Sequence, residues 1–200
     1  MENELVFEKF PSLSRLKRNC VITEKIDGTN AQICFDATGN ILVGSRKRQI
    51  WPEGTAGKNK GCDNSGFAGW AYSLKEELFA FLGEGRHFGE WAGAGIQRRY
   101  GLDKKVFLLF NTSRFGPGRQ EIPEKLITKG LGSVPVLYQG VFTTDAIDTI
   151  MDNLLLNGSH LNNFPKPEGI VIYHVALRDY FKVTYDHDMT GKGPNRQSEG

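Results

Sequence analysis

The chain lacks the features that mark several large classes of protein. It has only three cysteines in 200 residues, Cys20, Cys34 and Cys62, and none of them forms a Cys-x-x-Cys pair. Neither a zinc site nor a disulfide framework is therefore indicated, and a reducing, cytoplasmic setting is expected. No apolar run approaches the length of a membrane span and no apolar signal stretch opens the chain, so no membrane partner is expected.

An excess of charge is also missing. The formal net charge is only +2, so composition alone does not demand a nucleic-acid partner. Short basic clusters do occur, at residues 15–18, 46–48 and 98–99. Such clusters can contact phosphates, although most basic pairs are simply solvated.

The common phosphate-binding motifs are absent as well. Residues 54–59 (Gly-Thr-Ala-Gly-Lys-Asn) are too short for a P-loop and lack its Ser or Thr. Residues 93–95 (Gly-Ala-Gly) follow a predicted strand but do not complete the dinucleotide fingerprint, and the kinase signature set is missing. A nucleotide would have to be bound in another way.

The pattern of residues predicts a strand-rich α+β domain with antiparallel pairing. Turn residues separate short β-branched and aromatic segments, which predict strands at residues 19–26, 31–36, 40–45, 86–91, 105–111, 134–139, 169–175 and 180–185. We assign residues 1–185 to a single domain and residues 186–200 to a polar, flexible tail. Residues 52–69 are rich in glycine and predict a long loop.

Two helices are predicted from their caps and apolar faces. Residues 73–76 (Ser-Leu-Lys-Glu) match a capping box, followed by Leu74, Leu78 and Phe81 on one face. Thr144 is predicted to cap a second helix that runs through Leu156 and ends at Gly158. Its inward face is predicted to hold Ile147, Ile150, Met151, Leu154 and Leu155.

Residues 24–30 (Glu-Lys-Ile-Asp-Gly-Thr-Asn) are the most informative segment. Lys25 ends a predicted buried strand, between two carboxylates and before Gly28. A buried lysine loses its proton readily and can act as a nitrogen nucleophile. The alternative from this segment alone is a surface lysine paired with Glu24 or Asp27. Five further patches follow in order, at residues 44–48, 88–93, 106–111, 167–172 and 180–185.

Together these six patches resemble the covalent nucleotidyltransferases, which are the ATP-dependent polynucleotide ligases and the messenger-RNA capping enzymes. Residues 25–28 are similar to the nucleophile motif Lys-x-Asp-Gly, and the later patches to motifs Ia, III, IIIa, IV and V. Residues 24–30 and 46–52 resemble the RNA ligase 2 branch, which includes phage RNA-repair ligases. The resemblance implies an ATP-grasp-like ligase domain with two antiparallel sheets flanking an ATP cleft, plus helices, in a phage or bacterial intracellular setting.

The resemblance implies a role for each matching residue. Lys25 would attack the α-phosphate of ATP, and Lys182 would place a positive charge against that phosphate. Glu168 would hold Mg²⁺ or Mn²⁺ through oxygen. Ordinary sheet-edge placement is the alternative for the carboxylate Glu168.

Two more residues are implied to bind ATP. Glu90 would hold the ribose hydroxyls, and its alternative is likewise an ordinary edge carboxylate. Phe110 would stack on adenine and is preferred to Phe107, because residues 110–111 (Phe-Asn) resemble the family's Phe-Asp pair. Simple core packing is the alternative for either phenylalanine.

The remaining implied contacts concern phosphate and the RNA ends. Arg46 would grip phosphate and the RNA 5′ end by forked hydrogen bonds, and is preferred to Arg48. Asp27 and Asn30 would orient the site or contact RNA ends, and Glu24 joins the ATP-binding set beside the nucleophile. The four histidines show no metal-ligand spacing and are expected to be structural or exposed.

The chain departs from the motif pattern in two respects. Motif V usually carries a second basic residue where this chain has Thr184, for which Lys192 could substitute. The ligases also normally add a C-terminal domain, yet the chain ends fifteen residues after residue 185. An accessory protein could supply that domain.

We therefore expect an ATP-dependent RNA ligase that joins 3′-hydroxyl and 5′-phosphate ends through a covalent lysyl-AMP and an adenylylated 5′ end. Its partners would be RNA ends or a nicked duplex. The alternatives are a small DNA ligase, a GTP-dependent capping-type enzyme, and a degenerate module that binds nucleotide or RNA ends without catalysis.

Overall fold

The computed structural model describes residues 7–10, 12–55, 63–116 and 118–186. In chain order, its elements are β1 (Asn19–Lys25), β2 (Thr29–Phe35), β3 (Ile41–Ser45), β4 (Gln49–Ile50), α1 (Phe67–Ser73), α2 (Lys75–Leu82), β5 (Gly85–Gly93), β6 (Lys105–Leu109), α3 (Glu124–Thr128), β7 (Leu131–Ser133), β8 (Val136–Val141), α4 (Thr144–Asn157), β9 (Gly169–His174) and β10 (Asp179–Thr184). None of the described helices is long and apolar enough to cross a membrane.

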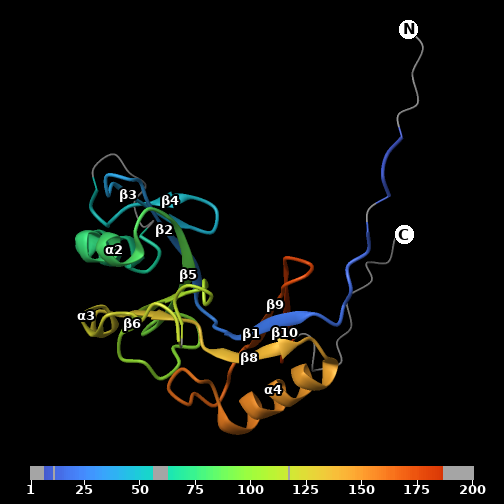
Figure 1. Ribbon diagram of the computed structural model, residues 1–200. Coiled ribbons are helices and arrows are strands. Elements are labelled where there is room, and N and C mark those ends of the chain that lie inside the picture. The colour runs from blue at the N-terminus through green and yellow to red at the C-terminus, as the bar shows by residue number, and fades with distance from the viewer. Residues whose placement is uncertain (1–6, 11, 56–62, 117, 187–200) are drawn as a thin grey trace, which may run out of the picture.

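The strands form two sheets that lie in separate lobes (Figure 1). One sheet has four strands in the order β10-β9-β1-β8, and the other has six in the order β4-β3-β2-β5-β6-β7. Every described pair of strands is antiparallel except β6 and β7, which run parallel. The predicted α+β class with two sheets is therefore confirmed, while the expectation of purely antiparallel pairing is wrong at this one edge.

The chain crosses from one sheet to the other immediately after Lys25. β1 belongs to the four-stranded sheet and β2 to the six-stranded sheet, so residues 26–28 link the two. Gly28 is required in this link, because an added Cβ would lie 2.5 Å from the Trp91 carbonyl oxygen and 3.0 Å from the Ala92 Cβ. The link therefore holds Lys25 at the junction of the sheets.

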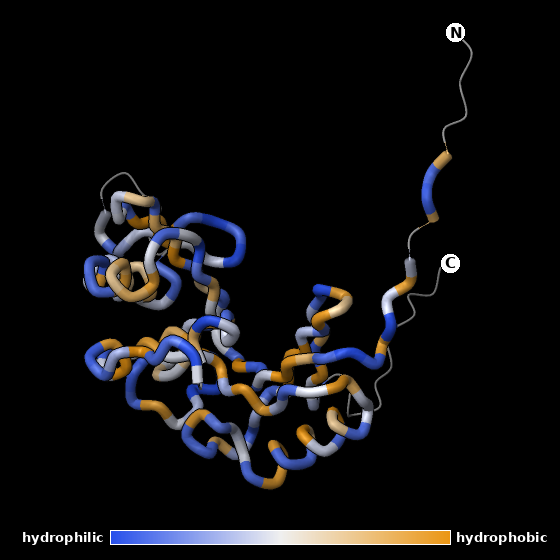
Figure 2. The backbone as a smooth tube through the Cα atoms, in the orientation of Figure 1, coloured by the Kyte–Doolittle hydropathy of each residue, from blue (hydrophilic) through white to orange (hydrophobic). Residues whose placement is uncertain are grey.

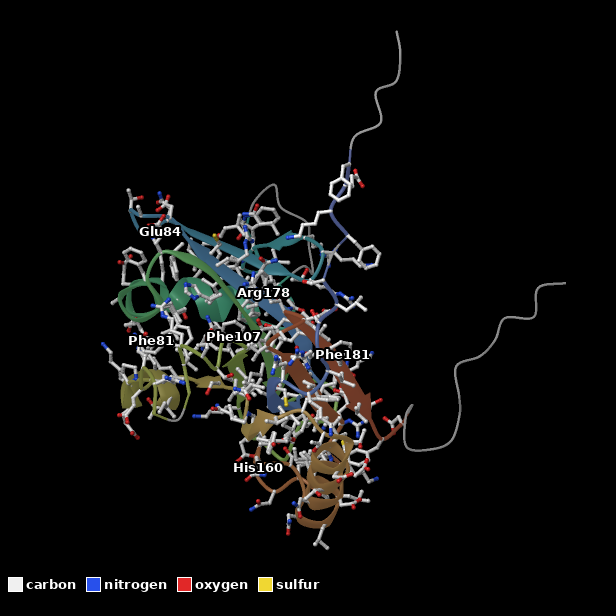
Figure 3. The ribbon with its side chains drawn as sticks, turned by 45° about the vertical axis from the view of Figure 1, so that its right-hand side comes forward. Phe81, Glu84, Phe107, His160, Arg178 and Phe181 are labelled. Atoms are coloured by element: carbon white, nitrogen blue, oxygen red, sulfur yellow. The ribbon has the colours of Figure 1, made fainter. Side chains whose placement is uncertain are left out.

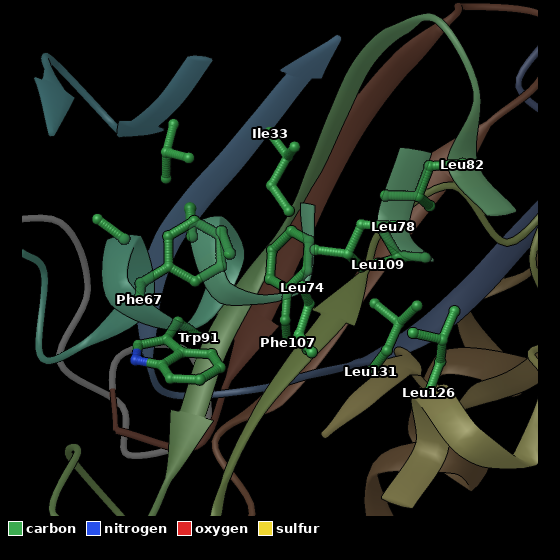
Figure 4. Close-up of a cluster of buried hydrophobic side chains, with 14 of the residues drawn as sticks. Ile33, Phe67, Leu74, Leu78, Leu82, Trp91, Phe107, Leu109, Leu126 and Leu131 are labelled. Atoms are coloured by element: carbon green, nitrogen blue, oxygen red, sulfur yellow. The ribbon is translucent and has the colours of Figure 1, made fainter. Parts of the chain in front are cut away.

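The six-stranded sheet packs one face against α1 and α2. Along β2, Ala31, Ile33 and Phe35 alternate inward and are at most 3% exposed. The helices contribute Phe67, Leu78 and Leu82, which belong to one cluster with Phe107 and Trp91 (Figure 4). Figure 2 shows short apolar and polar stretches interleaved along the chain, with the β3–β4 turn hydrophilic.

The four-stranded sheet is covered on one face by α4. Cys20 and Ile22 of β1 pack with Ile150, Met151 and Leu154 of α4. Side chains alternate along a strand, so Val21, Thr23 and Lys25 point to the opposite, helix-free face. The alternation of side chains along β1 thus places the residues that stabilise the sheet on one face and those that face the other lobe on the opposite face.

The predicted strands all form, with ends that shift by up to two residues. The structure adds β4 and β7, which are too short to leave an alternating pattern, and the short helix α3. It also adds α1, which begins at Phe67 inside the segment predicted to be a loop. Residues 56–62 of that loop, including Cys62, and the tail beyond residue 186 lie outside the described residues.

The predicted helix caps are wrong in two places. Ser73 ends α1, and its hydroxyl donates to the Trp70 carbonyl, so it does not cap α2, which begins after Leu74. The cap of α4 is Thr143 rather than Thr144, because the Thr143 hydroxyl accepts a hydrogen bond from the Ala146 amide at 3.1 Å. In each case an adjacent residue occupies the N-cap position, and Leu74 does so without a side-chain hydrogen bond.

One of the residues assigned to the inward face of α4 is also wrong. Leu155 is 63% exposed, whereas Ile150, Met151 and Leu154 are buried as predicted. Gly158 does end the helix, as predicted.

Phe107 and Phe110 should differ sharply in their contribution to stability. Phe107 is fully buried among aromatic rings, while Phe110 is 44% exposed. Phe107→Ala should lower the free energy of unfolding by about 3–5 kcal/mol, and Phe110→Ala by less than about 1 kcal/mol. Urea unfolding of both variants measures this, and equal losses would contradict the packing described above.

Candidate active site

A cavity of about 840 Å³ lies between the two sheets. Both helix-free faces contribute to its lining: Val21, Thr23, Lys25, Val171, Tyr173 and Tyr180 come from the four-stranded sheet, and Asn30, Arg86, Phe88, Glu90 and Phe110 from the other lobe. Cavities that hold small molecules and cofactors range over roughly 300–1,000 Å³. The space is therefore large enough for a nucleotide.

Lys25 and Glu168 form an ion pair in this region. The Lys25 Nζ lies 2.7 Å from the Glu168 Oε1, and the two side chains are 25% and 18% exposed. The pair arises from strand register, because Lys25 lies opposite Gly169, the residue after Glu168. Gly169 has φ of 149°, and a Cβ there would overlap the Val183 carbonyl oxygen, so β9 requires glycine at this point.

The second carboxylate oxygen of Glu168 is buried and has no hydrogen-bond partner within the described part of the chain. Burying a carboxylate oxygen without a hydrogen-bond partner costs free energy, and a bound cation would supply the missing partner. No cluster of three or more potential protein ligands exists among the described residues. A divalent ion here would therefore be held by Glu168 together with oxygens from water or phosphate, as is usual for Mg²⁺.

Glu90 and Asn30 meet across β2 and β5. They are register partners, and the Asn30 side-chain amide donates to the Glu90 Oε2 at 2.8 Å. Burial raises the pKa of Glu90 to about 7, although the Asn30 hydrogen bond and the Lys25 charge act in the opposite direction. Glu90 therefore presents a buried acceptor to the cavity.

Asp27 is held by two contacts from the loop after β5. Its backbone amide donates to the hydroxyl of Tyr100 at 2.7 Å, and the Arg98 Nε donates to the Asp27 Oδ2 at 3.1 Å. Tyr100 is fully buried, and burial raises its pKa. The buried side chain of Tyr100 thus fixes the turn that follows Lys25.

Glu24 is only 1% exposed and points to the face of β1 opposite Lys25. Its Oε2 accepts a hydrogen bond from the His160 amide at 2.9 Å, and Figure 3 shows His160 beside α4. Burial raises the pKa of Glu24. The residue lines the cavity, but its carboxylate is engaged with the loop after α4.

The structure separates the two phenylalanines that the sequence left as alternatives. Phe107 is in the core of the six-stranded lobe, in contact with Phe67 and Trp70 (Figures 3 and 4). Phe110 lines the cavity with its ring partly exposed, and its amide donates to the Phe88 carbonyl. Of the two, Phe110 is the one available to stack on a ligand.

Lys182 and Arg46 are more exposed than Lys25, and neither is among the residues that line the cavity. Lys182 is exposed on β10 opposite Val171, on the same strand face as Tyr180, which lines the cavity. Arg46 is exposed in the β3–β4 turn, which projects from the six-stranded lobe (Figure 1), and is not among the residues that line the cavity. Contact between Arg46 and a ligand in the cavity stays a prediction.

Thr184, where motif V usually has a second basic residue, is 2% exposed and pairs with Gly169. This position therefore presents no cation to the cavity. Lys192, the predicted substitute, lies outside the described residues.

Two residues near the site were missed as site residues from the sequence: Arg98 and Tyr100. Arg98 was noted only as half of a basic pair, and Tyr100 has no motif to mark it. The one available signal was the glycine-rich run at residues 93–95, which indicates a tight turn that could return the following residues toward Asp27.

Comparison with known proteins identifies the family to which this fold belongs. The RNA ligase family model matches residues 18–184, and the chain belongs to this family. Comparison with curated proteins finds no match.

The solved structures that resemble the chain include several of the Naegleria gruberi RNA ligase. A mutant with ATP and Mn has a TM-score of 0.58 at 21% identity, covering 84% of this chain and 50% of that one. A mutant with AMP and Mn gives 0.57 with the same identity and coverage, and an apo mutant gives 0.56 at 22% identity, covering 86% and 50%. The chain therefore spans about half the length of the ligase chains it matches.

Glu90 should make stability fall as pH rises. Its pKa is raised from 4.5 to about 7, so folding favours the protonated form, and this contribution is full below pH 4.5 and is lost as pH rises through 7. Between about pH 4 and pH 8, the free energy of unfolding of the wild-type protein should fall by up to about 3 kcal/mol relative to that of Glu90→Gln. Urea unfolding across this range, without ligand, measures the difference.

Glu84→Gln is the matched control, because Glu84 is exposed at the periphery of the lobe (Figure 3). It should follow the wild-type profile. Parallel profiles for wild type and Glu90→Gln would contradict the burial of an ionisable Glu90.

Proposed function

We propose that this chain is the nucleotidyltransferase domain of an ATP-dependent RNA ligase. The observation that carries the proposal is the Lys25–Glu168 ion pair, because it places an amine at the edge of a nucleotide-sized cavity. Membership of the RNA ligase family supports the substrate class. The similar Naegleria gruberi structures contain ATP or AMP with Mn, which supports the same ligands here.

Lys25 is the proposed nucleophile. Its Nζ lone pair attacks the α-phosphorus of ATP, a nitrogen–phosphorus bond forms, and the bond from that phosphorus to the bridging oxygen breaks to release pyrophosphate. The amine must first leave the ion pair and lose its proton. A divalent cation at Glu168 would neutralise phosphate charge and compete with Lys25 for the carboxylate.

Residues in the cavity and around it bind and orient ATP. Phe110 offers a ring face to adenine, and Glu90 accepts hydrogen bonds from the ribose hydroxyls. Lys182 of β10 pairs with Val171 of β9, which pairs in turn with Thr23 of β1. The long side chain of Lys182 brings positive charge toward the α-phosphate. Arg46, Asp27 and Asn30 are assigned to phosphate and the RNA ends.

Two further steps complete ligation. The AMP passes from Lys25 to the 5′-phosphate of one RNA end, and the 3′-hydroxyl of the other end then attacks that phosphate and expels AMP. Each step exchanges one bond to phosphorus for another, so no oxidant or reductant is needed. The second and third steps also need the RNA ends to be held, for which Arg46, Asp27 and Asn30 are the proposed contacts in this chain.

Incubation with ATP and Mn²⁺ or Mg²⁺ should add the mass of one adenylyl group to the intact protein. Lys25→Ala should abolish the adduct, because among the described residues Lys25 is the amine that pairs with Glu168. Lys75→Ala, on the surface of α2, is the matched control and should label as wild type does. Intact-mass spectrometry measures all three proteins.

GTP in place of ATP and nicked RNA beside nicked DNA separate the alternatives. An adduct with GTP alone would favour a capping-type enzyme, and sealing of DNA but not RNA would favour a DNA ligase. No adduct with either nucleotide, from folded protein that is free of AMP at the start, would exclude the enzyme and leave a module that only binds nucleotide or RNA ends.

A further inference from the structure

Arg98 connects three separate segments around the candidate active site. Its Nε donates to the Asp27 Oδ2 at 3.1 Å, and its Nη2 donates to the Asp186 Oδ2 at 2.7 Å. Its Nη1 donates to the Lys166 carbonyl at 3.1 Å and approaches the Pro167 carbonyl at 3.5 Å. The guanidinium is the side chain suited to this task, because its planar fork carries five donors in fixed directions.

Each segment that Arg98 contacts carries a residue of the proposed chemistry. Asp27 follows the nucleophile Lys25 by two residues, and residues 166–167 directly precede Glu168. Asp186 lies just beyond β10, the strand of Lys182. A single side chain therefore ties together the nucleophile, the carboxylate paired with it, and the strand that supplies the second lysine.

The loop that carries Arg98 is held in a strained conformation. Gln97, Arg99 and Tyr100 all have positive φ, at 43°, 60° and 50°. For residues other than glycine such conformations cost roughly 1–3 kcal/mol each, and they persist only where surrounding contacts determine them. Here the buried side chains of Ile96 and Tyr100 anchor the loop on both sides of Arg98.

Arg98 also affects which carboxylate Lys25 can pair with. Two residues of chain span at most about 7 Å, so the Asp27 carboxylate is near enough to compete with Glu168 for the Lys25 ammonium. In the structure the guanidinium engages the Asp27 carboxylate, while the Lys25 ammonium pairs with Glu168.

We infer that Arg98 is a positioning residue for the attack of Lys25 on ATP. It holds Asp27 away from the nucleophile and fixes the Lys25 turn against the segment that leads into Glu168. This inference rests on the proposed function. It assigns Arg98 no contact with ATP, so its removal should slow the chemical step more than it weakens nucleotide binding.

Arg98→Ala should lower the rate constant of self-adenylylation at saturating ATP by about 100-fold, the effect expected when a nucleophile is displaced by about 1 Å. The ATP concentration for half-maximal rate should change less than about 3-fold. Arg98→Lys should recover part of the rate, because it restores the charge without the fork. Time courses of adduct formation by intact mass, over a range of ATP concentrations, measure both quantities.

Arg99→Ala is the matched control, since Arg99 is the exposed neighbour in the same loop. It should retain the wild-type rate. Asp186→Ala removes one arm of the network at a side chain that is 65% exposed, and it should slow the rate by a smaller factor than Arg98→Ala. If Arg98→Ala does not fold, the rate of Asp186→Ala tests the positioning role of Arg98 in its place.

The outcomes distinguish this inference from the function on which it rests. If wild-type protein forms no adduct, the proposed function fails and the inference fails with it. If wild type labels and folded Arg98→Ala keeps the wild-type rate, or if Arg99→Ala is slowed equally, only the role of Arg98 is overturned. A loss confined to the fraction of folded protein, with a normal rate per folded molecule, also overturns it.

Discussion

The ion pair between Lys25 and Glu168 is the interaction on which the rest of the site depends. It joins the end of β1 to the start of β9, at the point where the chain leaves one sheet for the other. Gly169 permits the close approach of β9 and β10, and Gly28 permits the crossing to β2. An amine and a carboxylate, one of whose oxygens has no partner among the described residues, are thereby held where two sheet faces meet.

On the same strands, the residues that pack the core and the residues that line the cavity lie on opposite faces. On β1, Cys20 and Ile22 pack against α4, while Thr23 and Lys25 face the cavity. On β5, Trp91 packs with the helices, while Phe88 and Glu90 face the cavity. Because the strand period is two residues, a site can be built on a rigid sheet without breaking its core.

Much of the fold and site could be predicted because the signals were local. The strands left alternating patterns, and the motif resemblance selected residues such as Lys25, Glu90 and Phe110 that the structure brings to one cavity. What could not be predicted depends on long-range contact. The roles of Arg98 and Tyr100 come from partners about 70 residues away, and the parallel pairing of β7 with β6 from a three-residue strand. The caps at Ser73 and Thr144 failed because adjacent residues competed and only backbone geometry decides between them.

A crystal structure of the protein after reaction with ATP and Mn²⁺ would show directly whether Lys25 is the nucleophile. We predict continuous density from the Lys25 Nζ to the phosphorus of AMP, with adenine against Phe110 and the ion pair to Glu168 broken. Nucleotide bound with Lys25 still paired to Glu168, or AMP attached to a different side chain, would contradict it.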